Sequence, residues 1–153
     1  MSDPASTDAE LLRTFSTHVL VVAHQTATSS GLLEAVRKRA GQGDVTFHLL
    51  VPTQPHDTQT VIDPQEAGAD DAQKVLDVAL TELSAAAGQE VTGSVGESEP
   101  LMAIENAIRL GDYDEIIIST LPLGVSRWLR LDLVSKARRL GLPVTHVEAP
   151  GSN

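Results

Sequence analysis

The sequence predicts an α/β protein, a single three-layer α/β/α sandwich in which helices cover both faces of a five-stranded parallel sheet. Short runs of Val, Ile and Leu alternate along the 153 residues with segments of helical periodicity. Parallel neighbours need crossover connections, and the helical segments have the length to supply them. Aromatic residues make up only 3% of the chain, so the core must be aliphatic, as is typical of strands buried on both faces.

The strands follow from apolar runs that turn residues interrupt. They are expected over Val19–Ala23, Val45–Val51, Val91–Val95, Ile116–Ile118 and Pro143–Ala149. Apolar side chains at helical spacing, with a capping residue before them and a glycine or turn after them, predict four helices between these strands. The helices are expected from Ser29 or Ser30 to Ala40, from Asp70 or Asp71 to Ala87, from Pro100 to Gly111, and from Ser126 to Gly141.

Two stretches outside these elements are expected to be irregular. Residues 1–16 are polar and acidic, which predicts a flexible tail before a domain over 17–149 and does not fit a signal peptide. Residues 53–69 show no period and contain three Pro or Gly residues, which indicates a mobile loop. No apolar run approaches membrane-spanning length, and a cytoplasmic location is expected.

Composition argues against several kinds of site. The chain has no cysteine, which excludes disulfides, thiolate metal sites and thiol catalysis. A formal net charge of −10 disfavours general binding to nucleic acid or to an anionic membrane. The five histidines show no H-x-x-x-H pairing, so no metal site is expected. No pair of carboxylates has the spacing for acid–base work, and Ser126 lacks the G-x-S-x-G elbow of a hydrolase.

Polar and basic groups gather where the fourth strand passes to its helix. Ser119 and Thr120 end the strand, and Ser126 opens the helix with Arg127 and Arg130 beside it. Ligands of open α/β sheets bind at the carboxyl ends of the strands. A helix start flanked by guanidinium groups favours an anion, so a ligand site is predicted here.

The chain resembles the universal stress protein family over the whole order of elements from Val19 to Val147. The segment SRWLRLDLVSKARRLGLPVTHV is similar to the family's closing helix and last strand. The segments VVAHQTATS and STLP resemble short actinobacterial members more narrowly. The resemblance implies a Rossmann-like sheet in the order 3-2-1-4-5 and a homodimer. The edge strand 143–149 would pair with its own copy, because an uncovered edge strand needs a partner.

The nucleotide motif of the family, G-x2-G-x9-G-[S/T], does not carry over. The matching positions hold Ser119, Pro122, Asp132 and Leu133, so no glycine is kept. Pro122 has no N–H to offer a phosphate, and Asp132 adds a negative charge. ATP binding in the family's usual manner is therefore not expected, and no other cofactor is expected.

The implied strand order brings the loops after the first and fourth strands together at the switch point of the sheet. Their polar groups are the candidate residues for a small anionic ligand. These candidates are His24, Gln25, Thr26, Ser29, Ser119, Thr120, Ser126, Arg127 and Arg130. The alternative interpretation is that the serines are helix caps and that Thr26 is a turn residue.

Two functions remain open. The first is a non-catalytic stress-response or regulatory module, dimeric, that binds a small anionic ligand or none. The second is a small enzyme acting on a nucleotide or phosphorylated metabolite, with Arg127 and Arg130 holding phosphate and His24 as acid–base. The first is favoured because the sequence shows no nucleophile, metal cluster or oriented base.

Overall fold

The computed structural model describes residues 17–53, 64–122 and 126–149, with the side chains of 64–70 excepted. The strands are β1 (Thr17–Val22), β2 (Val45–Pro52), β3 (Thr92–Gly96), β4 (Glu115–Thr120) and β5 (Val144–Glu148). The helices are α2 (Ser30–Ala40), α3 (Pro64–Ala87), α4 (Pro100–Leu110), α5 (Arg127–Arg130) and α6 (Leu133–Arg138). The strands form one parallel sheet in the order β3-β2-β1-β4-β5, which confirms the predicted fold class and strand order.

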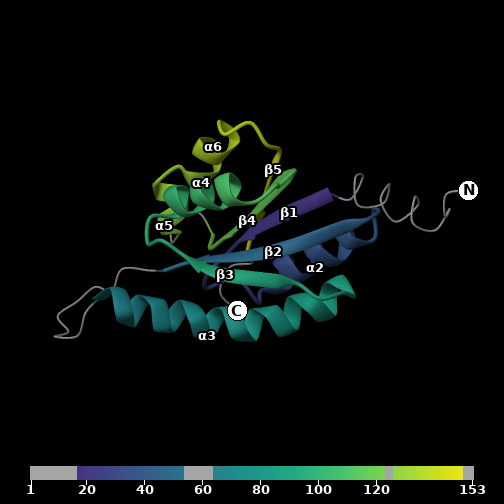
Figure 1. Ribbon diagram of the computed structural model, residues 1–153, viewed down its shortest axis with the longest axis horizontal. Coiled ribbons are helices and arrows are strands. Elements are labelled where there is room, and N and C mark those ends of the chain that lie inside the picture. The colour runs from purple at the N-terminus through teal and green to yellow at the C-terminus, as the bar shows by residue number, and fades with distance from the viewer. Residues whose placement is uncertain (1–16, 54–63, 123–125, 150–153) are drawn as a thin grey trace, which may run out of the picture.

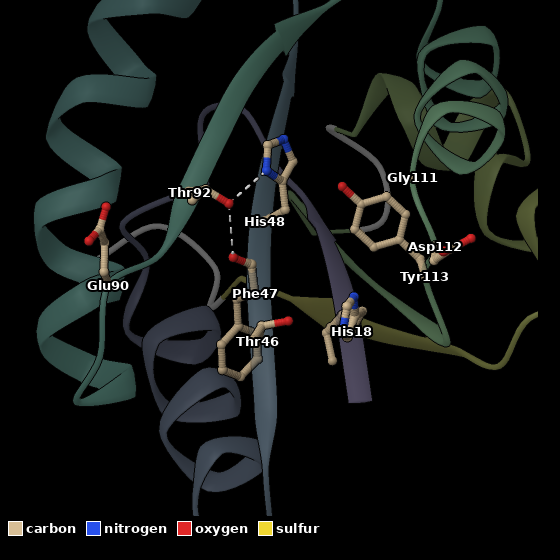
Figure 2. Close-up of a pocket in the computed structure, with 10 residues that line it drawn as sticks. His18, Thr46, Phe47, His48, Glu90, Thr92, Gly111, Asp112 and Tyr113 are labelled. Atoms are coloured by element: carbon tan, nitrogen blue, oxygen red, sulfur yellow. Dashed lines mark hydrogen bonds between the residues drawn. The ribbon is translucent and has the colours of Figure 1, made fainter. Parts of the chain in front are cut away.

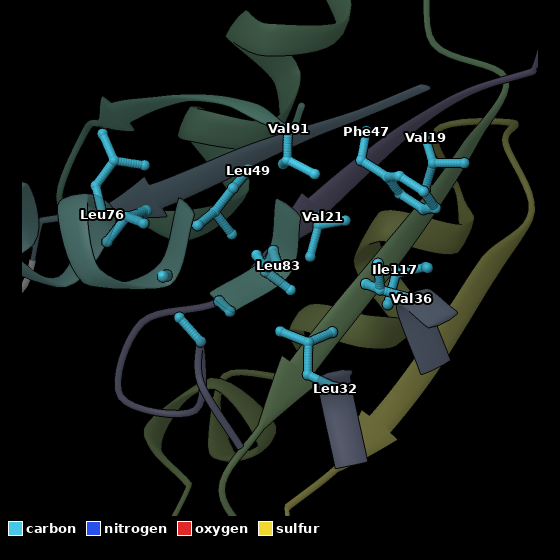
Figure 3. Packing of buried hydrophobic residues seen from close by; sticks show 14 of the residues in the cluster. Val19, Val21, Leu32, Val36, Phe47, Leu49, Leu76, Leu83, Val91 and Ile117 are labelled. Carbon is cyan, nitrogen blue, oxygen red and sulfur yellow. The ribbon is translucent and has the colours of Figure 1, made fainter. Parts of the chain in front are cut away.

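Helices α2 and α3 cover one face of the sheet, and α4, α5 and α6 cover the other (Figure 1). Side chains alternate between the two faces along each strand. In β1, Val19 and Val21 therefore join the cluster under α2 and α3, whereas Leu20 and Val22 join the cluster under α4 and α6. Figure 3 shows the first cluster, which is almost entirely aliphatic, as the composition predicts.

An ion pair fixes the end of α2 to the sheet. The Arg39 Nε donates to both carboxylate oxygens of Glu115 at 3.1 and 3.2 Å, and its Nη2 donates to Oε1 at 2.9 Å. Glu115 begins β4, so the pair ties a helix to the neighbouring central strand. No helix among the described residues is both long and apolar enough to cross a membrane.

Helix α3 begins earlier than the sequence analysis expects. It starts at Pro64, so the expected cap at Asp70 or Asp71 is wrong, and residues 64–69 of the expected loop are helical. Proline suits the first turn of a helix. Gln65, Glu66 and Ala67 have a high helix propensity, but they do not extend the pattern of apolar side chains at helical spacing. A periodicity criterion misses such a turn. The remainder of that loop, residues 54–63, and the expected tail, residues 1–16, lie outside the described residues.

The single helix expected after Ser126 is two short helices. Leu131 and Asp132 separate α5 from α6, and Asp132 has a left-handed backbone with φ 58°. Trp128 is buried in α5, and the next buried residues are Leu133 and Val134. A spacing of five residues does not fit one face of a continuous helix. The break changes the phase so that both helices pack their apolar side chains against the sheet.

Candidate functional site

The predicted crevice lies at the carboxyl ends of β1 and β4, which are hydrogen-bonded neighbours in the sheet. The loop after β1 carries Thr26, and β4 ends in Ser119 and Thr120. The hydroxyls of Thr26 and Ser119 are 2.7 Å apart and hydrogen-bonded, and both residues are buried. The structure therefore brings together two of the candidate residues that are 93 positions apart in the chain.

His24 precedes Thr26 by two residues, in the turn after β1, and is only 7% exposed. Neither Nδ1 nor Nε2 has a hydrogen-bond partner among the described residues. Burial lowers the pKa of the imidazole, because water no longer solvates its charged form, and Asp71 opposes the shift only in part. His24 is therefore neutral near pH 7 and offers one donor and one acceptor that the described part of the chain leaves unused.

The serines act as helix caps, as the alternative interpretation predicts. The Ser29 hydroxyl accepts from the backbone N–H of Leu32 at the start of α2. The Ser126 hydroxyl accepts from Leu129 N–H, and its own N–H donates to the carbonyl of Pro122 at 3.1 Å. The N–H and the hydroxyl of Ser126 are therefore both already hydrogen-bonded within the chain.

Thr120 is buried, and its hydroxyl group is hydrogen-bonded to the edge strand β5. Its Oγ1 donates to the carbonyl of Leu121 at 2.9 Å and lies 2.8 Å from His146 Nε2 on β5. A hydroxyl that donates to a carbonyl accepts from the ring, so His146 carries its proton on Nε2. Thr120 thus links the carboxyl end of β4 to the edge strand.

The remaining candidates are on the surface. Gln25, Arg127 and Arg130 are exposed. Because α5 has only four residues, its dipole is small, and the two arginines need no compensating anion to explain their position. Of the candidate residues, His24, Thr26, Ser119, Thr120 and Ser126 are buried, and among these Thr26 and Ser119 are hydrogen-bonded to each other.

A second polar site, at the opposite end of the sheet, is absent from the sequence analysis. His48 on β2 lies between Thr92 and Ser94 of β3. Its Nδ1 is 2.8 Å from the Thr92 hydroxyl (Figure 2). Its Nε2 is 2.9 Å from the Ser94 hydroxyl. The pairing of His48 with Thr92 in the β2–β3 register creates this contact. The signal in the sequence is the alternation of Thr92 and Ser94, which identifies a site only once that register is known.

The sequence matches no protein-family model and no curated protein. Solved structures of similar shape do match. A universal stress protein from Archaeoglobus fulgidus has a TM-score of 0.62 at 15% identity, over 90% of this chain and 98% of that one. A universal stress protein family member from Burkholderia pseudomallei has 0.61 at 19% identity, over 85% and 94%.

A third match is the Archaeoglobus fulgidus universal stress protein in complex with dAMP, with a TM-score of 0.58 at 15% identity, over 87% and 98% of the two chains. At these identities the likeness concerns the fold, and it extends over nearly the whole length of each chain. Strand order, helix placement and coverage all agree. This chain has the universal stress protein fold.

Proposed function

We propose that the protein is a non-catalytic regulatory module of the universal stress protein family that binds a small ligand at the crevice between β1 and β4. The observation that carries this proposal is His24, a buried imidazole with both ring nitrogens unpartnered among the described residues. Leaving a buried polar group unsatisfied costs about 1–3 kcal/mol. A ligand that donates to one nitrogen and accepts from the other would remove that cost.

The setting of His24 supports a ligand of mixed polarity. The buried Thr26–Ser119 hydroxyl pair belongs to the same loop through Thr26 and can be opened by a ligand that replaces the shared hydrogen bond. Arg127 and Arg130 are exposed on α5 and suit an anionic group at the outer side of the ligand. The Archaeoglobus fulgidus protein with the same fold was solved in complex with dAMP, which combines a hydrogen-bonding ring with one phosphate.

A sensor is favoured over an enzyme because His24 is poorly suited to catalysis. A general base is normally oriented by a third group that holds its second nitrogen. No described residue hydrogen-bonds either nitrogen of His24. The proposed role is therefore recognition of the ligand by a neutral imidazole.

ATP in the family's usual manner is not the proposed ligand. Pro122 has no N–H, and Asp132 places a carboxylate where the motif has its third glycine. Millimolar ATP with magnesium is expected to leave the melting temperature unchanged, whereas a ligand at a hundred times its Kd adds about 2.7 kcal/mol of stability. A rise of several degrees would show that another phosphate cradle replaces the glycines.

The proposed module is a homodimer that pairs through β5. This strand is at the end of the sheet order, so one side of its backbone has no neighbouring strand among those described. The N–H of Ala149 donates to Thr120, and the carbonyl of Pro143 accepts from Ile116. Because backbone groups alternate along a strand, the groups of Val144 and His146 point away from β4 and are placed to pair with a second copy.

The ligand proposal is tested by titrating AMP, then inorganic phosphate, into the ¹⁵N-labelled protein and following the backbone amide resonances. We expect AMP to shift the signals of residues 24–27 and Ser119, and a His24→Phe variant to lose those shifts. His18→Gln, a change of a histidine at the other end of β1, is the matched control and should respond as the wild type does. Shifts that His24→Phe retains, or no shift at all at millimolar AMP, would contradict the proposal.

A further inference from the structure

Ser94 is an exposed serine whose hydroxyl is hydrogen-bonded to a histidine. It lies on β3 and pairs with Leu50 of β2, two residues after His48, so its side chain is on the same face of the sheet as that of His48. The Ser94 Oγ is 2.9 Å from His48 Nε2. Because Ser94 is exposed, a reagent in solution can reach its hydroxyl.

The hydrogen bonds on the other side of the ring fix the tautomer of His48. The Thr92 hydroxyl donates to the carbonyl of Phe47 at 3.4 Å. A hydroxyl has one proton, so Thr92 accepts from His48 Nδ1–H, 2.8 Å away (Figure 2). The proton of the neutral ring is therefore on Nδ1, and Nε2 is the acceptor of the Ser94 hydroxyl. Burial lowers the pKa of His48, so the ring is neutral near pH 7.

The three side chains have the arrangement that activates a hydroxyl nucleophile. Such a set needs a nucleophile within hydrogen-bond reach of a base, and a third group that orients the base. Ser94 supplies the hydroxyl, His48 the base and Thr92 the orienting group. His24 in the crevice differs, because neither of its nitrogens has a partner among the described residues.

The surroundings favour a neutral electrophile over a phosphate. His48 and Thr92 also line a pocket of about 330 Å³, whose described lining residues include no lysine and no arginine. Phosphoryl transfer depends on metal ions and on lysine or arginine side chains that neutralise the phosphate oxygens. The carbonyl group of a thioester is uncharged and needs no such cation, so an acyl group suits these residues better.

We propose that Ser94 is a site of covalent modification that accepts an acyl group from a thioester. The Ser94 Oγ attacks the carbonyl carbon of the thioester while His48 Nε2 takes up the hydroxyl proton. The new C–O bond replaces the C–S bond, and the thiolate that leaves takes the proton from His48 and departs as a thiol. Thr92 positions the ring by accepting from Nδ1–H. The proposal concerns one modification per chain and does not depend on the proposed function.

The test is exposure of the protein to S-acetyl-N-acetylcysteamine, a small neutral thioester, followed by peptide mapping with mass spectrometry. We expect an acetyl ester at Ser94, which hydroxylamine removes, whereas acetyl amides on lysines resist it. Ser98 is the internal comparison, because it is also exposed and has no hydrogen bond to a histidine among the described residues. A general base contributes about 10²–10⁴-fold, so Ser94 should react at least about a hundred times faster than Ser98.

Variants separate the roles of the three side chains. His48→Gln should slow acetylation of Ser94 to about the rate at Ser98. Thr92→Val should also slow it, and Thr92→Ser, which keeps the hydroxyl, should restore it. Ser98→Ala is the matched control and should leave the rate at Ser94 unchanged. The wild-type rate should be constant above about pH 6.5 and fall below it, as His48 takes up a proton.

Equal rates at Ser94 and Ser98 in the wild-type protein would overturn the proposal. That comparison needs no variant, so it does not depend on whether a substituted chain folds. A rate at Ser94 that His48→Gln leaves unchanged, in a variant whose amide spectrum shows the native fold, would overturn the proposal as well.

Discussion

His24 is buried and His48 is half-buried, and burial lowers the pKa of both rings, but their surroundings differ. His48 is bonded at both ring nitrogens by Thr92 and Ser94, whereas the two nitrogens of His24 have no partner among the described residues. The same residue type thus supports the sheet at one end and is available for a ligand at the other. The difference comes from the neighbouring strands and not from the histidine itself.

These two rings predict how stability depends on pH. Burial lowers both pKa values below the unfolded value of about 6.5, so the unfolded chain takes up protons first. Their contribution to stability is complete above about pH 6.5 and is lost as the pH falls below it toward the folded pKa values. Urea unfolding at pH 7.5 and 5.5 should show this loss, and His24→Gln or His48→Gln should reduce it. His18→Gln is the control, and a loss that neither variant reduces would contradict the assignment.

Asp132 occupies a backbone conformation that glycine adopts more easily. Its φ of 58° is left-handed, and its side chain makes no capping bond to α6. A non-glycine residue pays about 1 kcal/mol in this region. Asp132→Gly is therefore expected to raise the free energy of unfolding by up to about that amount, as measured in urea. Asp132→Ala keeps the cost and should not stabilise; an equal gain from both changes would point to the removed charge instead.

At the scale of single elements, β3 depends on a close approach to α3. A Cβ on Gly93 would meet the side chain of Leu76 at 2.5 Å and the carbonyl oxygen of Leu49 at 3.0 Å. The backbone oxygen cannot move without disturbing the β2–β3 ladder. Because Gly93 has no side chain, the edge strand β3 can pack directly against the long helix α3 at this position.

Gly93→Ala should accordingly lower the free energy of unfolding by about 1–3 kcal/mol, the range for an overpacked core. Gly41→Ala is the matched control. Gly41 has a right-handed helical backbone, and its nearest neighbour to a new Cβ is at 3.6 Å, so stability should be equal or slightly higher. Equal stability of Gly93→Ala and the wild type would mean that Leu76 and Leu80 move aside at no cost.

The elements also show where sequence reasoning succeeds and where it fails. Helices α2 and α4 could be predicted closely because a capping serine and a first-turn proline mark their starts and glycines follow them. The start of α3 could not be predicted, because its first residues favour a helix but carry no apolar side chains at helical spacing. The break at Asp132 could not be predicted either, because the change of buried face between two helices leaves no local signal. The buried pair Thr26–Ser119 could be placed only through the strand order, and the His48 network required the register as well.

At the scale of the whole molecule, dimerisation through β5 can be tested at His146. Its N–H points away from β4, so His146→Pro removes a donor to the second copy and should give a monomer by light scattering. His146→Ala is the control, because it also loses the bond to Thr120 but keeps the N–H, and it should remain a dimer. A proline at Val147 would instead cut a bond to β4 and so tests the fold. A dimer that survives His146→Pro would place the interface elsewhere.

The hydrogen bond between Thr120 and His146 connects the two proposed activities of the molecule. Thr120 follows Ser119 of the crevice, and His146 lies on the strand proposed to pair with a second copy. A ligand that changes the position of Thr120 would therefore change the edge, and by reciprocity the pairing of two chains would change the affinity for that ligand. The concentration of the protein in the cell would set the fraction of chains that are paired. It would thereby also set the ligand concentration at which the protein responds.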